Sequence, residues 1–134
     1  MKRTFLTIII LLITFSLSFA AEKSFLKVDE NKDGKISRQE YTSSASRSFD
    51  KLDENKDGTL SREEIAAHDQ INTEKFINAI NPGKEGKIVK KNYMQAAEQQ
   101  FKTMDKNQDD YIDMKEWSFF RSKPKQPMLV IFTF

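Results

Sequence analysis

Two twelve-residue segments of nearly the same sequence place the tightest limit on how this chain can fold. They read DENKDGKISRQE at 29–40 and DENKDGTLSREE at 53–64. Each carries oxygen-bearing side chains at positions 1, 3, 5, 9 and 12, with a glycine at position 6. A loop that curls around one centre, with the glycine in a positive-φ turn, aims these oxygens at a single ion. Because Ca²⁺ takes roughly six to eight oxygen ligands, the spacing predicts two calcium loops.

The ligands expected in the two loops follow one scheme. Position 7 offers its backbone carbonyl, position 9 coordinates directly or holds a water, and the glutamate at position 12 closes the site with both carboxylate oxygens. The expected ligands are Asp29, Asn31, Asp33, Lys35, Ser37 and Glu40 in the first loop, and Asp53, Asn55, Asp57, Thr59, Ser61 and Glu64 in the second. The residue at position 8, Ile36 in the first loop, is expected to make a short strand contact with a partner loop.

A repeat with an offset of 52 residues indicates that this two-loop unit was duplicated. The sequence from Gly34 aligns without a gap with the sequence from Gly86. The matched pairs are Ile36 with Ile88, Tyr41 with Tyr93, Ala45 with Ala97, Phe49 with Phe101, Asp53 with Asp105, and Glu64 with Glu116. The duplication therefore predicts two further loops, at 81–92 and 105–116.

The two duplicated loops differ in their ligands. Segment 105–116 (DKNQDDYIDMKE) keeps a full set, namely Asp105, Asn107, Asp109, Tyr111 through its carbonyl, Asp113 and Glu116. Asp110 stands there in the glycine position, where an aspartate is tolerated at some cost. Segment 81–92 (NPGKEGKIVKKN) retains Glu85 as its one carboxylate, so we expect it to keep the loop shape and bind no metal. Three calcium sites are thus predicted.

Ordinary local structure explains parts of these loops. Ser37 with Glu40, and Ser61 with Glu64, fit the S-x-x-E capping box that begins a helix, and Asp-Gly is common turn chemistry. These alternatives account for two or three residues in each loop rather than six at fixed spacing. The closing glutamate can serve both roles because it belongs to the first turn of the exit helix.

Apolar residues between the loops recur at helical spacing. Tyr41, Ala45, Phe49 and Leu52 form one stripe, which Tyr93, Ala97, Phe101 and Met104 repeat. The serine-rich stretch 42–48 is interpreted as the solvated face of this helix rather than a linker. Apolar pairs also precede each loop by four and one residues, including Phe25 with Val28 and Ile77 with Ile80. Asn72 can begin a separate helix within 65–80.

These loops and stripes resemble the EF-hand superfamily, the calmodulin-like proteins, over about residues 24–121. The closest likeness is to exported bacterial members with closely spaced hands. The resemblance implies an all-α array of helix–loop–helix units, four loops in two duplicated pairs, with short β contacts between loops. A spacing of 24 residues from Asp29 to Asp53 leaves room for one helix of roughly 15 residues, or ~22 Å, between them. Loops 29–40 and 53–64 should lie at its opposite ends, which favours pairing of the second loop with the third and the first with the fourth.

The first 20 residues have the pattern of a cleavable signal peptide. Lys2 and Arg3 precede an apolar run from Phe5 to Phe19, and small residues at Ser18 and Ala20 predict cleavage after Ala20. A membrane anchor is the alternative, but the run falls short of the ~20 residues of a spanning helix. We expect a domain at 21–122, followed by a linker and apolar tail at 123–134, in an exported protein, periplasmic or secreted, with no membrane span after cleavage.

Composition narrows the functional classes. Residues 21–134 carry 20 basic and 20 acidic side chains, so charge gives no support for nucleic-acid binding. The chain has no Cys and a single His68, without a catalytic arrangement around it, and no enzyme is expected. Calcium is the predicted ligand. The role is left open between an extracytoplasmic sensor or buffer and a structural or adhesive module that binds a protein partner. Segment 128–134 (MLVIFTF) either packs on the domain or forms a partner-binding or aggregation-prone end.

Overall fold

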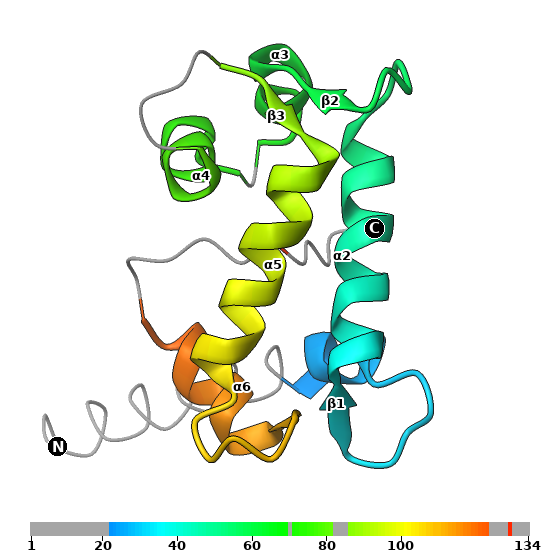
Figure 1. The fold of residues 1–134 in the computed structure, drawn as a ribbon, viewed down its shortest axis with the longest axis vertical. Coiled ribbons are helices and arrows are strands. Elements are labelled where there is room, and N and C mark those ends of the chain that lie inside the picture. Colours follow the sequence, from blue (N-terminus) through cyan, green and yellow to red (C-terminus); the bar gives the residue numbers. More distant parts are fainter. Residues whose placement is uncertain (1–21, 70, 82–85, 124–128, 130–134) are drawn as a thin grey trace, which may run out of the picture.

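The computed structural model describes residues 22–69, 71–81, 86–123 and 129. A helix over residues 22–28 leads into the first loop. The labelled elements are β1 (Lys35–Ser37), α2 (Arg38–Leu52), β2 (Thr59–Leu60), α3 (Arg62–Ala66), α4 (Thr73–Ile80), β3 (Ile88–Val89), α5 (Lys90–Met104), β4 (Tyr111–Asp113) and α6 (Met114–Arg121) (Figure 1). The predicted signal peptide and most of the 123–134 tail lie outside the described residues.

The expected array of helices joined by loops with short β contacts is present in this part of the chain. β1 pairs with β4 and β2 pairs with β3, both antiparallel. The first loop therefore lies beside the fourth and the second beside the third, as the length of α2 predicted. Figure 1 shows the two strand pairs at opposite ends of α2 and α5.

The core lies between α2 and α5, which pack side by side (Figure 1). The ring of Tyr41 lies 5.7 Å from that of Phe101, and the ring of Phe49 lies 5.3 Å from that of Tyr93. The offset of 52 converts one pair into the other, so the two helices cross with approximate twofold symmetry. The apolar stripes predicted for both helices are fully buried, and burial of such side chains contributes about 1.5–3 kcal/mol each.

The serine-rich stretch of α2 is helical, but its prediction as a solvated face was partly wrong. Ser44 and Ser48 are buried, at 8% and 4% exposure. The hydroxyl of Ser48 donates to the backbone carbonyl of Ser44 at 2.9 Å. A small side chain whose hydroxyl bonds to a carbonyl of its own helix is readily buried.

The connection between the two units contains the predicted second helix. The side chain of Asn72 accepts the backbone N–H of Lys75 at 3.0 Å and so caps α4. Phe76 and Ile77 of α4 are buried, whereas Ile80 is only partly buried. His68 lies partly buried in the bend after α3 rather than on a helix face. None of the helices in the described segments is long and apolar enough to cross a membrane.

Candidate metal-binding loops

The carboxylate at position 1 organises each of the three loops with complete ligand sets. Asp29 Oδ1 accepts the N–H of Asp33 at 3.2 Å, and Oδ2 accepts the N–H of Gly34 at 3.0 Å. The equivalent bonds to Asp53 in the second loop are 3.1 and 2.9 Å. Asp29 is only 1% exposed. These hydrogen bonds therefore curl the loop tightly around its first carboxylate without the help of an ion.

The loop 105–116 adopts the same turn without a glycine. Asp110 takes the left-handed conformation at φ 64°, where Gly34 and Gly58 have φ 82° and 81°. Its N–H donates to Asp105 Oδ2 at 3.1 Å, as the glycines do in the other loops. The aspartate thus preserves the geometry at the cost of backbone strain.

The side chains at positions 3 and 5 are held by the same backbone bonds in each loop. In the first loop Asn31 Oδ1 accepts the N–H of Asp33 at 3.0 Å, and Asp33 Oδ1 accepts the N–H of Lys35 at 2.9 Å. The matching bonds in the second loop are both 2.8 Å, and those in 105–116 are 3.1 and 3.0 Å. These bonds fix the direction of the side-chain oxygens, and Asp57 Oδ1 also accepts the hydroxyl of Thr59 at 2.7 Å.

The closing glutamates fold back over the loop entrance. Glu40 Oε1 accepts the N–H groups of Glu30 and Asn31 at 3.0 and 3.1 Å, while Oε2 accepts the N–H and the hydroxyl of Ser37, both at 2.8 Å. Burial would raise the pKa of Glu40, but the bonds from Ser37, Asn31 and Glu30 together hold it below its ordinary value. Glu116 makes equivalent bonds in the 105–116 loop, to the N–H groups of residues 106, 107 and 113.

Two carboxylates of the second loop, Glu64 and Asp57, also have a pKa below the ordinary value. The N–H of Ser61 and then its hydroxyl lower the pKa of Glu64. The hydroxyl and N–H of Thr59 lower the pKa of Asp57. An ionised carboxylate in a loop of oxygen donors attracts a hard cation.

The residues at position 9 start the exit helices as well as facing the loop. Ser37 and Ser61 form the capping boxes that the sequence predicted. Asp113 forms a third, accepting the N–H groups of Lys115 and Glu116, both at 2.8 Å. This capping role of Asp113 was missed in the sequence, although D-x-x-E carries the same signal as S-x-x-E.

Two ion pairs between paired loops were also missed. Arg38 donates to Asp110 Oδ1 at 2.7 Å, and Lys35 Nζ lies 3.8 Å from Asp109 Oδ2. They connect residues of the first and fourth loops, which lie too far apart in the sequence for a local pattern to predict the contact. Both pairs are well exposed, so each contributes little to stability.

Segment 81–92 is described only at its two ends, because residues 82–85 lie outside the described residues. Its second half forms β3, which pairs Thr59 with Val89 and Leu60 with Ile88. Val89, at position 9, is exposed and carries no oxygen on its side chain. The described part of this segment therefore pairs with the second loop.

The donor set of the three loops suits a hard cation. Within the described ranges, no three acidic, histidine or cysteine side chains converge closely enough to hold a metal by themselves. The acidic ligands predicted for one loop, such as Asp29, Asp33 and Glu40, therefore do not converge on a single point here. All the donors are oxygens, and the chain contains no Cys. Oxygen-only sets suit Ca²⁺ or Mg²⁺ rather than Zn²⁺.

A family model described as "EF hand" matches residues 21–43, 47–67 and 97–120, together just over half of the chain. This chain therefore belongs to the EF-hand family. The three matched segments contain or overlap the three loops with complete ligand sets. A search of curated proteins finds no match to the chain. Membership of the family implies Ca²⁺ as the ligand.

Proposed function

We propose that the protein binds three Ca²⁺ ions, one in each of the loops 29–40, 53–64 and 105–116, and none in 81–92. The observation that carries the proposal is the shared network: in all three loops the first carboxylate accepts the N–H groups of positions 5 and 6. Asp110 adopts the same turn although it is not a glycine. The ligands are the six oxygen donors of each loop named above.

Calorimetric titration of the full chain tests the number of sites. We expect three ions per chain, and a triple variant Glu40→Gln, Glu64→Gln, Glu116→Gln should lose tight binding. Glu54→Gln is a matched control for Glu64→Gln, because Glu54 is an exposed acid at position 2 of the same loop. Unchanged stoichiometry in the triple variant would contradict the ligand assignment. A fourth bound ion would contradict the proposal for 81–92.

We further propose that the protein is exported, as the basic start, apolar run and Ser18–Ala20 pattern of residues 1–20 suggest. Mass spectrometry of the protein expressed in a cell with a secretion pathway measures the outcome. A mature chain that begins at Ala21 supports export with cleavage. A chain that keeps residues 1–20 and stays in the cytoplasm contradicts it.

The role that fits these features is an extracytoplasmic calcium sensor or buffer. Trp117 provides the probe that separates the possibilities. It follows Glu116, is fully buried, and meets Phe25 edge to face at 5.9 Å, so it contacts the entrance helix of the first loop. Its fluorescence should therefore report filling of the paired first and fourth loops.

A calcium titration that follows Trp117, far-UV circular dichroism and an apolar dye distinguishes the roles. A buffer stays folded without calcium and keeps its dye binding constant, whereas a sensor gains exposed apolar surface on loading. A chain that is unfolded without calcium would show instead that calcium completes the fold. That last result favours the structural or adhesive module over the sensor and buffer.

A further inference from the structure

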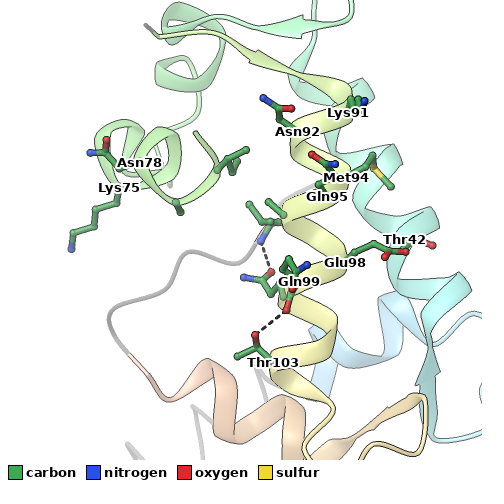
Figure 2. Close-up of a pocket in the computed structure, with 15 residues that line it drawn as sticks. Thr42, Lys75, Asn78, Lys91, Asn92, Met94, Gln95, Glu98, Gln99 and Thr103 are labelled. Atoms are coloured by element: carbon green, nitrogen blue, oxygen red, sulfur yellow. Dashed lines mark hydrogen bonds between the residues drawn. The ribbon is translucent and has the colours of Figure 1, made fainter. Parts of the chain in front are cut away.

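A groove runs along the face of α5 that also meets α4. Figure 2 shows Lys75 and Asn78 carried by α4 on one side, and Asn92, Gln95 and Gln99 carried by α5 on the other. Its apolar floor includes Ile80, Met94 and Ala96, which pack against the core. Leu129, far along the chain from both helices, is also part of its lining.

Leu129 is fixed in this groove by both of its backbone polar groups. Its N–H donates to Gln100 Oε1 at 2.9 Å, and its carbonyl accepts the hydroxyl of Tyr93. Its side chain belongs to the hydrophobic core, and the residue is 3% exposed. Proteins commonly bind extended peptides in this way: hydrogen bonds hold the peptide main chain, and an apolar pocket holds a side chain.

The acceptor of this site is shared with the other tyrosine of the repeat. Tyr41, the counterpart of Tyr93, donates to the same Gln100 Oε1 at 2.6 Å. The position equivalent to Gln100 in the first unit is Ser48, whose hydroxyl bonds the carbonyl of Ser44 on its own helix. The duplicated units therefore differ here: Tyr41 finds its acceptor on the facing helix, and Tyr93 finds one on Leu129.

The difference between the acceptors of Tyr41 and Tyr93 matters for stability because both tyrosines are buried. Tyr41 and Tyr93 are both 0% exposed, so a hydroxyl without an acceptor would be costly at either position. The carbonyl of Leu129 meets that need for Tyr93, and the amide of Leu129 uses the second lone pair of Gln100 Oε1. The four groups form one continuous, partly buried network that links α2, α5 and residue 129.

We propose that Tyr93 and Gln100, with Tyr41 behind them, form a peptide-binding site, and that Leu129, from this chain's own apolar tail, occupies it. Leu129 is the described residue of that tail, and it is already seated. Leu129 thus acts as an internal ligand in the groove of α4 and α5. The proposal is independent of calcium binding.

Hydrogen exchange of the Leu129 amide, measured by NMR on the full chain, tests the backbone contact. We expect exchange to be at least tenfold slower than in an unstructured peptide. Tyr93→Phe keeps the ring and removes one bond, and should speed exchange roughly fivefold. Tyr111→Phe is the control, because Tyr111 is 40% exposed in β4 and has no part in this network, and it should leave the rate within about twofold. Exchange at the rate of a free peptide in the unmodified protein overturns the proposal.

Substitution of the anchor tests occupation of the groove. Leu129→Asp should release the segment and increase the fluorescence of an apolar dye severalfold, while Leu26→Asp, at a leucine that is 54% exposed, should not. Leu129→Ala is a milder variant in case Leu129→Asp does not fold, and it should give a smaller increase. Unchanged dye binding in a folded Leu129 variant contradicts the proposal.

A peptide of residues 125–134 added to the Leu129→Asp chain tests whether the site binds in trans. We expect it to displace the dye, whereas the same peptide carrying Leu129→Asp should fail. Displacement by both peptides would show nonspecific apolar binding and overturn the site. A second copy is the competing occupant: sedimentation that shows a dimer in the unmodified protein but a monomer for Leu129→Asp would reject the intrachain segment.

Discussion

Ile36 in β1 lies directly opposite Ile112 in β4, and both side chains are fully buried. This contact joins the first loop to the fourth, because each isoleucine follows the turn of its own loop by two residues. The corresponding contact at the other end of the molecule joins Leu60 to Ile88. The loop segments are therefore in contact in two pairs, the first with the fourth and the second with the third.

Pairing predicts which calcium sites influence each other. Glu116→Gln is expected to weaken calcium binding in loop 29–40 by roughly fivefold or more, because an ion in one loop stabilises the strand pair that shapes the other. Glu64→Gln should leave loop 29–40 unchanged, since its loop pairs with 81–92. The Gly34 amide resonance, followed through a calcium titration, reports the first loop. Equal weakening by both variants would show that coupling does not follow the strand pairs.

Replacement of Asp110 by glycine should stabilise the calcium-free protein by about 1 kcal/mol, because it relieves a left-handed conformation that costs an L-residue about that much. Loss of the exposed Arg38–Asp110 ion pair offsets only a small part of the gain. Gly58→Ala is the converse variant: its added Cβ meets no atom within 4 Å, so any loss reflects backbone strain. Urea unfolding measures both, and a loss of stability in Asp110→Gly contradicts the strain.

The two aromatic pairs between α2 and α5 should contribute alike. Phe49→Ala and Phe101→Ala are each expected to cost about 3–5 kcal/mol, because each leaves a cavity in the buried contact with Tyr93 or Tyr41. Phe119→Ala is the control, as Phe119 is 46% exposed, and should cost only about 1 kcal/mol, mainly through its contacts with Lys106 and Lys123. Thermal or urea unfolding gives the values. A large difference between Phe49→Ala and Phe101→Ala would argue against the twofold packing.

Stability should fall at high pH because of the buried tyrosines. Burial raises the pKa of Tyr93 and of Tyr41 well above the ordinary tyrosine value, and for Tyr41 a charge on Tyr93 adds to the effect. The folded protein thus retains protons that the unfolded chain releases above about pH 10. The contribution is complete below that pH and is lost as the pH rises beyond it.

Urea unfolding at pH 9 and pH 11 measures this loss. The double variant Tyr41→Phe, Tyr93→Phe should show a smaller decrease between the two pH values, since it has no buried phenol to ionise. Lysines are present in both proteins, so their titration cancels in the comparison. The same decrease in both would mean that the buried tyrosines do not cause it.

Much of the candidate site could be read from short stretches of sequence. The oxygen donors of a loop lie within twelve residues, and their network is local, so Asp29 and Gly34 meet whatever surrounds them. The 24-residue spacing from Asp29 to Asp53 predicted the length of α2, and that length placed the paired loops at opposite ends. Asp113 shows the limit of this reasoning, because its cap is equally local and was overlooked.

The sequence by itself determined the loops, the helices and the faces they bury, because these depend on spacing within a few turns of chain. Tertiary structure alone decided that Ser44 and Ser48 are buried, that Arg38 meets Asp110, and that Leu129 joins Tyr93 and Gln100. These contacts join residues on different elements, or set how closely two helices approach. Their energies depend on the final packing, and no periodic pattern in the sequence records it.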